Sequence, residues 1–176
     1  RLAGTALEYY ADDNSGMIPN MTGPEYSGYS IPIVRMFGGM AFALGRLVEQ
    51  YRVPPEAFGC PLNPDRGPDY VGSQWQAGGV VQTGYIYRET DAGFRPLKSH
   101  HDNAARALVM DFACMSGSGV PLVPHNLESV NALYNDGHAE KLRNTAAVGD
   151  RYTTSTTAGA VTVPVCAFIW EHADAE

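Results

Sequence analysis

The sequence predicts an α+β domain in which an N-terminal helix and a second helix pack on a mostly antiparallel β-sheet. Apolar residues recur at helical spacing near the start of the chain, and five later segments have the composition of strands. An Asp-Gly dipeptide joins two of those segments, as is typical of a β-hairpin. The 19 glycines and 12 prolines favour many turns over a helical bundle.

The first helix is predicted to run from the N-terminus to about Asp13. Its apolar positions share helical spacing: Leu2, Ala3, Ala6, Leu7 and Tyr10. Gly16 and Pro19 follow, and a helix rarely continues through such residues. We expect Asn14 or Gly16 to adopt the left-handed conformation that ends the helix.

A second helix is predicted over residues 33–51, where apolar residues again follow helical spacing. Gly38 and Gly39 weaken this helix or allow another element to approach it closely. Pro54 and Pro55 would stop it. Residues 59–79 are rich in turn-forming residues, and we expect no regular element there.

The five strand segments are predicted at 80–88, 106–112, 130–135, 138–143 and 161–170. The run 106–112 is continuously apolar, which suits a central strand buried on both faces. Pro164 places the last strand at a sheet edge, because proline cannot donate to a ladder. We therefore divide the chain into a globular head, 1–150, and a Thr-rich linker with a C-terminal edge strand, 151–176.

The hairpin is the most informative stretch of the chain. Val130 to Tyr134 is read as one strand, Asn135-Asp136-Gly137 as a tight turn, and His138 to Leu142 as the returning strand. We expect a type I′ turn, which needs positive φ at both central residues.

Histidines and aspartates in the second half of the chain could hold a divalent metal. The group is His100, His101, Asp102, Asp111, His125, Asp136 and His138. Imidazole and carboxylate ligands suit zinc, manganese or iron, and Asp102, Asp111, His125 and Asp136 would be the ligands. However, no pair has tight ligand spacing such as His-Glu-x-x-His, and Asp is also favoured in turns for local hydrogen bonds.

The cysteines are Cys60, Cys114 and Cys166, and none forms a Cys-x-x-Cys pair, which disfavours a structural zinc site. They allow at most one internal disulfide, whose pairing the sequence leaves open, or they are three small buried residues. Cys114 with His125 could in principle be a thiol nucleophile and its base, but nothing in the sequence orders them.

The net charge of −7 and the scattered arginines disfavour nucleic acid and anionic membrane surfaces as partners. No transmembrane segment, no signal peptide and no Gly-x-Ser-x-Gly elbow occurs in the sequence given.

Several segments, in order, resemble one family. Tyr10 to Pro19 resembles the end of the long first helix in bacterial prepilin-like and type II secretion pseudopilin-like proteins. The segment from Phe37 to Cys60-Pro61 is similar to their central segment. Gly84 to Tyr87 and Ala107 to Asp111 look like two of their core strands.

The last part of the resemblance is a C-terminal signature of a histidine, a spacer and Asp-Gly. Here His125, Asp136, Gly137 and His138 match it. The family's usual spacer has nine residues, whereas ten separate His125 from Asp136, so a bulge or longer loop is expected.

The resemblance implies a pilin-like head whose natural protein continues upstream with a short basic leader and an apolar helix of ~20 residues. It implies a structural subunit, not an enzyme, of a type II secretion or type IV pilus-like filament. That subunit would be anchored in the inner membrane, with its head in the periplasm or on the cell surface. Self-association, other pilin-like subunits and the secretion or pilus machinery would be its partners.

Calcium is the cofactor that the resemblance leaves open, because major pseudopilins hold this ion with oxygen ligands near the C-terminal end of the head. Two other functions remain as alternatives. One is an exported module that binds a ligand or a cation, and the other is a metal-dependent hydrolase built on the His/Asp cluster.

Overall fold

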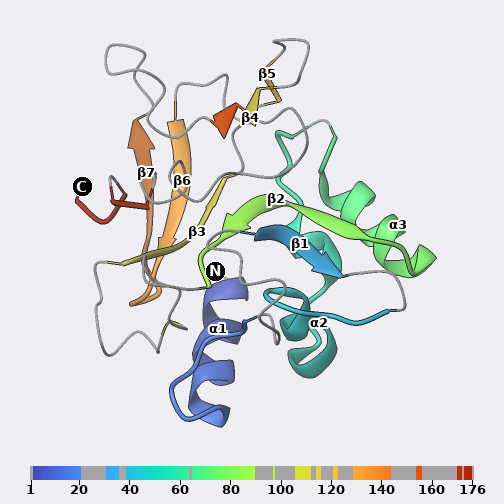
Figure 1. Cartoon of the computed structure of the whole chain (residues 1–176), viewed down its shortest axis with the longest axis horizontal. Coiled ribbons are helices and arrows are strands. Elements are labelled where there is room, and N and C mark those ends of the chain that lie inside the picture. Colours follow the sequence, from blue (N-terminus) through green and yellow to red (C-terminus); the bar gives the residue numbers. More distant parts are fainter. Residues whose placement is uncertain are drawn as a thin grey trace.

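Five strands form the main sheet in the order β1-β2-β3-β6-β7, and all neighbouring pairs are antiparallel (Figure 1). The computed structural model describes residues 2–20, 31–35, 39–63, 65–89, 97, 106–111, 114–115, 121–122, 129–143, 154–155, 170–171 and 173–175. The strands are β1 (Ile31–Arg35), β2 (Val81–Tyr87), β3 (Ala107–Asp111), β6 (Ser129–Tyr134) and β7 (Ala139–Arg143). The predicted α+β class and four of the five predicted strands are confirmed.

A second, smaller sheet has the order β5-β4-β8. Its strands are β4 (Cys114–Met115), β5 (Pro121–Leu122) and β8 (Thr154–Ser155). β4 pairs antiparallel with β5 and parallel with β8.

Helix α1 (Leu2–Asp13) ends where the sequence predicts. The Gly16 N–H donates to the Ala11 carbonyl at 2.8 Å, and Gly16 has a φ of 82°. Ser15 is also left-handed, with a φ of 57°. Asn14 instead donates from its side-chain nitrogen to the Tyr10 carbonyl at 2.8 Å. Its side chain therefore satisfies one of the carbonyls that the end of the helix exposes.

The predicted helix over 33–51 is wrong in its first part. Strand β1 covers Ile31–Arg35, and α2 begins only at Gly45 and ends at Tyr51. Between them the backbone takes positive φ at Gly39 (83°) and Ala43 (49°), which a right-handed helix cannot contain. Pro32 fits β1 because this strand lies at the edge of the sheet, where a missing N–H donor is tolerated.

Helix α3 (Pro68–Ala77) occupies a segment expected to be irregular. Pro68 stands at its start, and Gly78 closes it with a φ of 74° and an N–H that donates to the Trp75 carbonyl. Proline at the first position and glycine just beyond the end are a recognised helix pattern. Val71 is its buried apolar residue, and the short 3₁₀ helix η2 (Pro55–Phe58) packs beside it.

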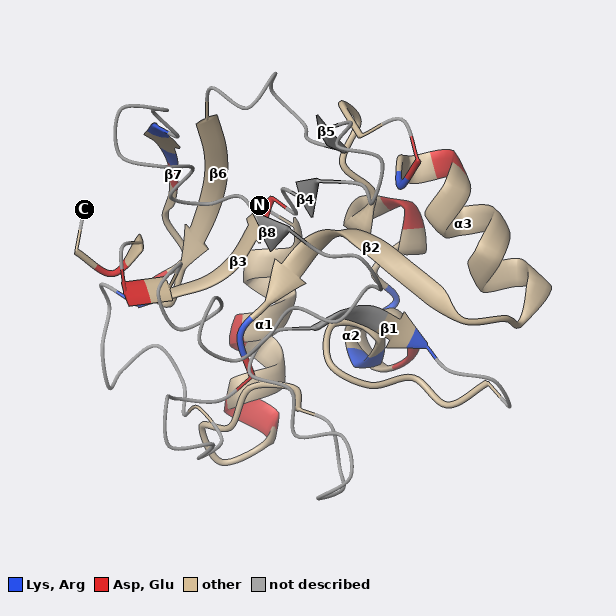
Figure 2. Cartoon of the chain, turned by 45° about the horizontal axis from the view of Figure 1, so that its top comes forward, with Lys and Arg blue, Asp and Glu red and all other residues tan. Residues whose placement is uncertain are grey.

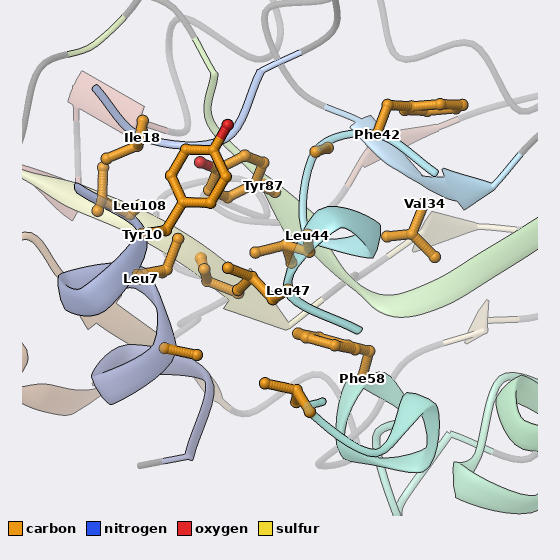
Figure 3. Close-up of a cluster of buried hydrophobic side chains, with 14 of the residues drawn as sticks. Leu7, Tyr10, Ile18, Val34, Phe42, Leu44, Leu47, Phe58, Tyr87 and Leu108 are labelled. Carbon is orange, nitrogen blue, oxygen red and sulfur yellow. The ribbon is translucent and has the colours of Figure 1, made fainter. Parts of the chain in front are cut away.

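The hydrophobic core lies between the helices and the main sheet (Figure 3). Leu7 and Tyr10 of α1 meet Leu47 of α2 and Tyr87 of β2 there. All five residues of β3 are buried, so the predicted central strand is confirmed. Among the described residues, no helix has the length and apolar character needed to cross a bilayer.

Polar contacts hold α1 and α2 together beside the core. The Tyr51 hydroxyl donates to the Asp13 carboxylate at 2.7 Å, and Arg46 donates to the Tyr10 hydroxyl at 3.1 Å. The hydrogen bond from Tyr51 to Asp13 is the main cause that raises the pKa of Tyr51 to about 12. The end of α1 is thereby fixed to the end of α2.

The C-terminal residues pack on the head. Trp170 and Ala173 are fully buried, and the Tyr134 hydroxyl donates to the Ala173 carbonyl at 2.9 Å. Of the predicted strand 161–170, residues 161–169 lie outside the described part, and Trp170 is in a helical turn instead of a strand. β8 and this helical turn are thus two places where the segment 151–176 contacts the rest of the chain.

Candidate functional site

The predicted hairpin is confirmed, but its turn differs from the expected type. The Tyr134 N–H donates to the His138 carbonyl at 2.9 Å, and the Gly137 N–H donates to the Tyr134 carbonyl at 3.0 Å. Gly137 has a φ of 85°, whereas Asn135 and Asp136 do not have positive φ. The type I′ prediction is therefore wrong. The turn is a three-residue loop with one left-handed glycine, another common way to close a hairpin.

Asp136 and His138 are partners of each other on the surface. The Asp136 carboxylate makes a short contact with the His138 ring nitrogen Nδ1 and accepts the His138 backbone N–H at 3.1 Å. Burial tends to raise the pKa of Asp136, but the hydrogen bonds and charge of His138 outweigh it and lower that pKa. The His138 ring stacks on Tyr134, with the ring centroids 4.3 Å apart.

Helix α1 lies against this turn. A Cβ atom placed on Gly137 would come within 2.9 Å of the Glu8 carboxylate oxygen Oε1. A small groove between α1 and the turn includes Gly137 and is lined by Gly4 and Leu7 of α1 and by Leu133 of β6. Gly137 is therefore favoured in this turn for two reasons: its φ is positive, and a larger residue would come too close to α1. Its geometry supports a role in seating α1 on the sheet.

Asp111 is buried and belongs to a different polar cluster. Its carboxylate oxygen Oδ2 accepts the Asn131 backbone N–H at 2.7 Å and the Asn131 side-chain N–H at 2.8 Å. Tyr85 is the cross-strand partner of Asp111. Burial, followed by the nearby Cys60 and Asp111, raises the pKa of Tyr85 to about 12. Tyr85, Asp111 and Asn131 form a polar row across β2, β3 and β6.

Cys60 lies beside this row as a buried free thiol. Burial is the main cause that raises its pKa, and Asp111 adds to the effect. A raised pKa keeps the sulfur protonated, which disfavours nucleophilic chemistry. The side chains of Cys114 and Cys166 lie outside the described residues.

The predicted metal ligands are only partly placed. Asp102 and His125 lie outside the described residues. Asp111 and Asp136 lie apart. Asp111 contacts Asn131, and three further residues of β6, about 10 Å of strand, separate Asn131 from the turn that holds Asp136. In the described ranges, no group of three or more His, Cys, Asp and Glu side chains is placed to hold a metal. The calcium site stays a prediction.

Sequence reasoning missed Asn131, Tyr85 and Cys60 as partners of Asp111. The signal for two of them was present in part. Once the strands are paired antiparallel, the register brings Tyr85 opposite Asp111 and lets Asn131 reach it from β6. Cys60 comes from a turn after η2, and no local pattern predicts that contact.

No family model matches the chain, and the searches of curated proteins and of solved structures also gave no match.

Replacing Gly137 with alanine is expected to destabilise the fold by about 1–2 kcal/mol, since an L-residue with this φ is strained. The added Cβ would also press on Glu8. Urea unfolding followed by circular dichroism measures the loss. The double variant Glu8→Ala, Gly137→Ala separates the two causes, because it removes the contact and keeps the strain. An unchanged unfolding midpoint in Gly137→Ala would contradict this account of the turn.

Proposed function

We propose that this chain is the head of a pilin-like or pseudopilin-like structural subunit of a type II secretion or type IV pilus-like envelope filament. The observation that carries the proposal is that α1 has large apolar residues on its exposed surface as well as on its buried face. One side packs into the core through Ala6, Leu7 and Tyr10. Beside this buried face, α1 exposes two large apolar residues seven positions apart, Leu2 (54%) and Tyr9 (60%).

This spacing gives α1 an apolar strip for a partner helix. Residues seven apart lie on the same face of an α-helix. Thr5 lies between them and is also exposed. A helix that carries large apolar residues on its exposed surface as well as on its buried face is suited to lie between the sheet of its own head and neighbouring helices.

The surface charge fits heads that lie at the outside of such an assembly. Acidic residues occur on α1, on η2 and at the start of α3, and the whole chain has 19 acidic against 12 basic residues (Figure 2). Like-charged heads stay soluble and keep apart except where specific contacts hold them. Assembly would then be driven by the apolar helices and not by attraction between heads.

In the proposed mechanism, an upstream apolar helix continuous with α1 anchors the subunit in the inner membrane and bundles with its copies along the filament axis. The head stands in the periplasm or on the cell surface. The hydrogen bond between Tyr51 and Asp13 supports this role, because it fixes the C-terminal end of α1 to the head, and Glu8 in the middle of α1 lies close to Gly137. The subunit acts by packing, without catalysis.

Photo-crosslinking of the full-length protein in its native cells tests the proposal. A photoreactive amino acid placed at Tyr9 is expected to give a ladder of homo-multimers in the membrane fraction, since this position faces a neighbouring helix. The matched control carries the same amino acid at Gln76, an exposed residue of α3. That position should give far fewer multimers.

Two results would contradict the proposal. One is full-length protein that stays monomeric after crosslinking at Tyr9. The other is full-length protein that remains in the soluble fraction of lysed cells. Equal ladders from Tyr9 and Gln76 would show self-association without the proposed helix contact.

A further inference from the structure

A cavity of about 290 Å³ opens between the first turn of α1, η2 and the main sheet. Its walls are mainly apolar and include Leu2, Phe58 and Leu133. None of its lining residues is an Asp, Glu, Lys, Arg or His. A charged ligand would leave water without gaining a partner of opposite charge, so the lining selects uncharged groups.

Two of the lining residues carry hydrogen-bonding side chains, Tyr85 and Asn131. They come from β2 and β6, on either side of Asp111, and belong to the polar row already described. The hydroxyl of Tyr85 is neutral at physiological pH, as in an ordinary tyrosine, and burial raises its pKa further, to about 12. The cavity therefore combines apolar walls with a phenol and an amide, the usual composition of a small-molecule pocket.

The volume limits the size of a ligand. An apolar cavity of roughly 150 Å³ holds one benzene ring, so this one holds one or two rings. We propose that the cavity binds an uncharged aromatic group of one or two rings that carries a single hydrogen-bonding substituent. The inference does not rest on the proposed filament function. Such a group would be a free small molecule or the side chain of an aromatic residue, such as the exposed Tyr9, from a second copy of this chain.

Titration with p-cresol and with indole, followed by amide chemical shifts, tests the binding site. We expect saturable binding with a Kd of about 1 mM or tighter, typical of ligands of this size. 4-Methylbenzoate and benzylamine have similar size but carry a charge, and each is expected to bind at least about tenfold more weakly. The absence of saturable binding of both p-cresol and indole at millimolar concentration would overturn the proposal.

Variants locate the site. Ala57 and Ala139 line the cavity and are exposed, so larger side chains there fill the opening without disturbing the core. Ala57→Leu and Ala139→Phe are each expected to weaken p-cresol binding about tenfold or more, whereas Gln76→Phe on α3 leaves it unchanged. Tyr85→Phe should weaken p-cresol binding about fivefold and leave toluene binding unchanged, as loss of one hydrogen bond predicts. If p-cresol binds the Ala57→Leu and Ala139→Phe proteins as tightly as the parent protein, the assignment to this cavity is overturned.

Sedimentation velocity distinguishes the two sources of the ligand. Self-association that p-cresol reverses, and that Tyr9→Ala also abolishes, identifies a side chain of a second copy as the occupant. A protein that binds p-cresol and stays monomeric identifies a free small molecule. Both outcomes support the site. They are independent of the crosslinking result, which concerns the membrane-anchored protein.

Discussion

Replacing Asp174 with alanine is expected to destabilise the fold by about 3 kcal/mol, since the change removes the carboxylate from a buried guanidinium. Arg88 donates from Nη1 to both carboxylate oxygens of Asp174, at 3.0 and 2.8 Å, and its side chain is only 6% exposed. The Ala107 backbone N–H donates to the same carboxylate at 2.9 Å. The Asp174 carboxylate therefore accepts hydrogen bonds both from the Arg88 guanidinium and from the backbone of β3.

Thermal and urea unfolding of Asp174→Ala measures this loss. Glu171→Ala is the matched control, because Glu171 lies in the same short segment and is exposed. We expect its stability to stay within about 0.5 kcal/mol of the parent protein. The double variant Arg88→Met, Asp174→Ala should recover part of the loss, since no charge remains buried there. Equal stabilities of the Asp174→Ala and Glu171→Ala proteins would contradict this account.

The C-terminal contact also shows what a local sequence pattern cannot reveal. The predicted strand 161–170 relied on the apolar composition of that run, and the run included Trp170. In the structure Trp170 is fully buried in a helical turn, with the Arg88 guanidinium 5.6 Å from its ring. Arg88 is 82 positions away in the sequence. The local pattern of the run 161–170 contains no sign of this distant partner.

Strands with strong local signals were predicted well. β6 and β7 combine strand composition with an Asp-Gly turn, and β3 is a continuous apolar run, so each signal is contained in a few residues. The turn type was predicted wrongly because a left-handed Gly137 occurs in two kinds of hairpin loop. Sequence alone does not state the φ of Asn135 and Asp136.

The candidate metal ligands show the same limit for a site. Asp111 ends a strand that was correctly predicted, and a carboxylate is a suitable ligand for a divalent metal. In the structure it accepts two hydrogen bonds from Asn131 and lies beside Tyr85 and Cys60. Asp136 is occupied by His138 in the turn. Which polar groups meet depends on strand register and on packing, and neither follows from residue spacing.

The failed prediction of a helix over 33–51 leads to the second large effect. Apolar spacing alone fitted that helix, but β1 needs the first part of the segment as the edge strand beside β2. The chain must then turn back so that α2 crosses β1. It does so where Gly45, the first residue of α2, lies directly on the Val34 carbonyl. Phe42 donates its N–H to that same carbonyl at 3.1 Å, so the oxygen is held in place.

Replacing Gly45 with alanine is therefore expected to destabilise the fold by at least about 3 kcal/mol, at the upper end of overpacking effects. The added Cβ would overlap the Val34 carbonyl oxygen, and a backbone oxygen cannot move aside as a side chain can. Gly79→Ala is the control, because its Cβ would meet nothing closer than 3.9 Å. Urea unfolding of both variants gives the comparison, and a Gly45→Ala protein that unfolds with the Gly79→Ala protein would refute the close crossing of α2 over β1. A loss of stability confined to Gly45→Ala would establish that the missing methyl group at position 45 lets α2 cross β1 closely. The segment 33–51, whose apolar spacing predicts a single helix, can then contain most of a strand and a separate helix.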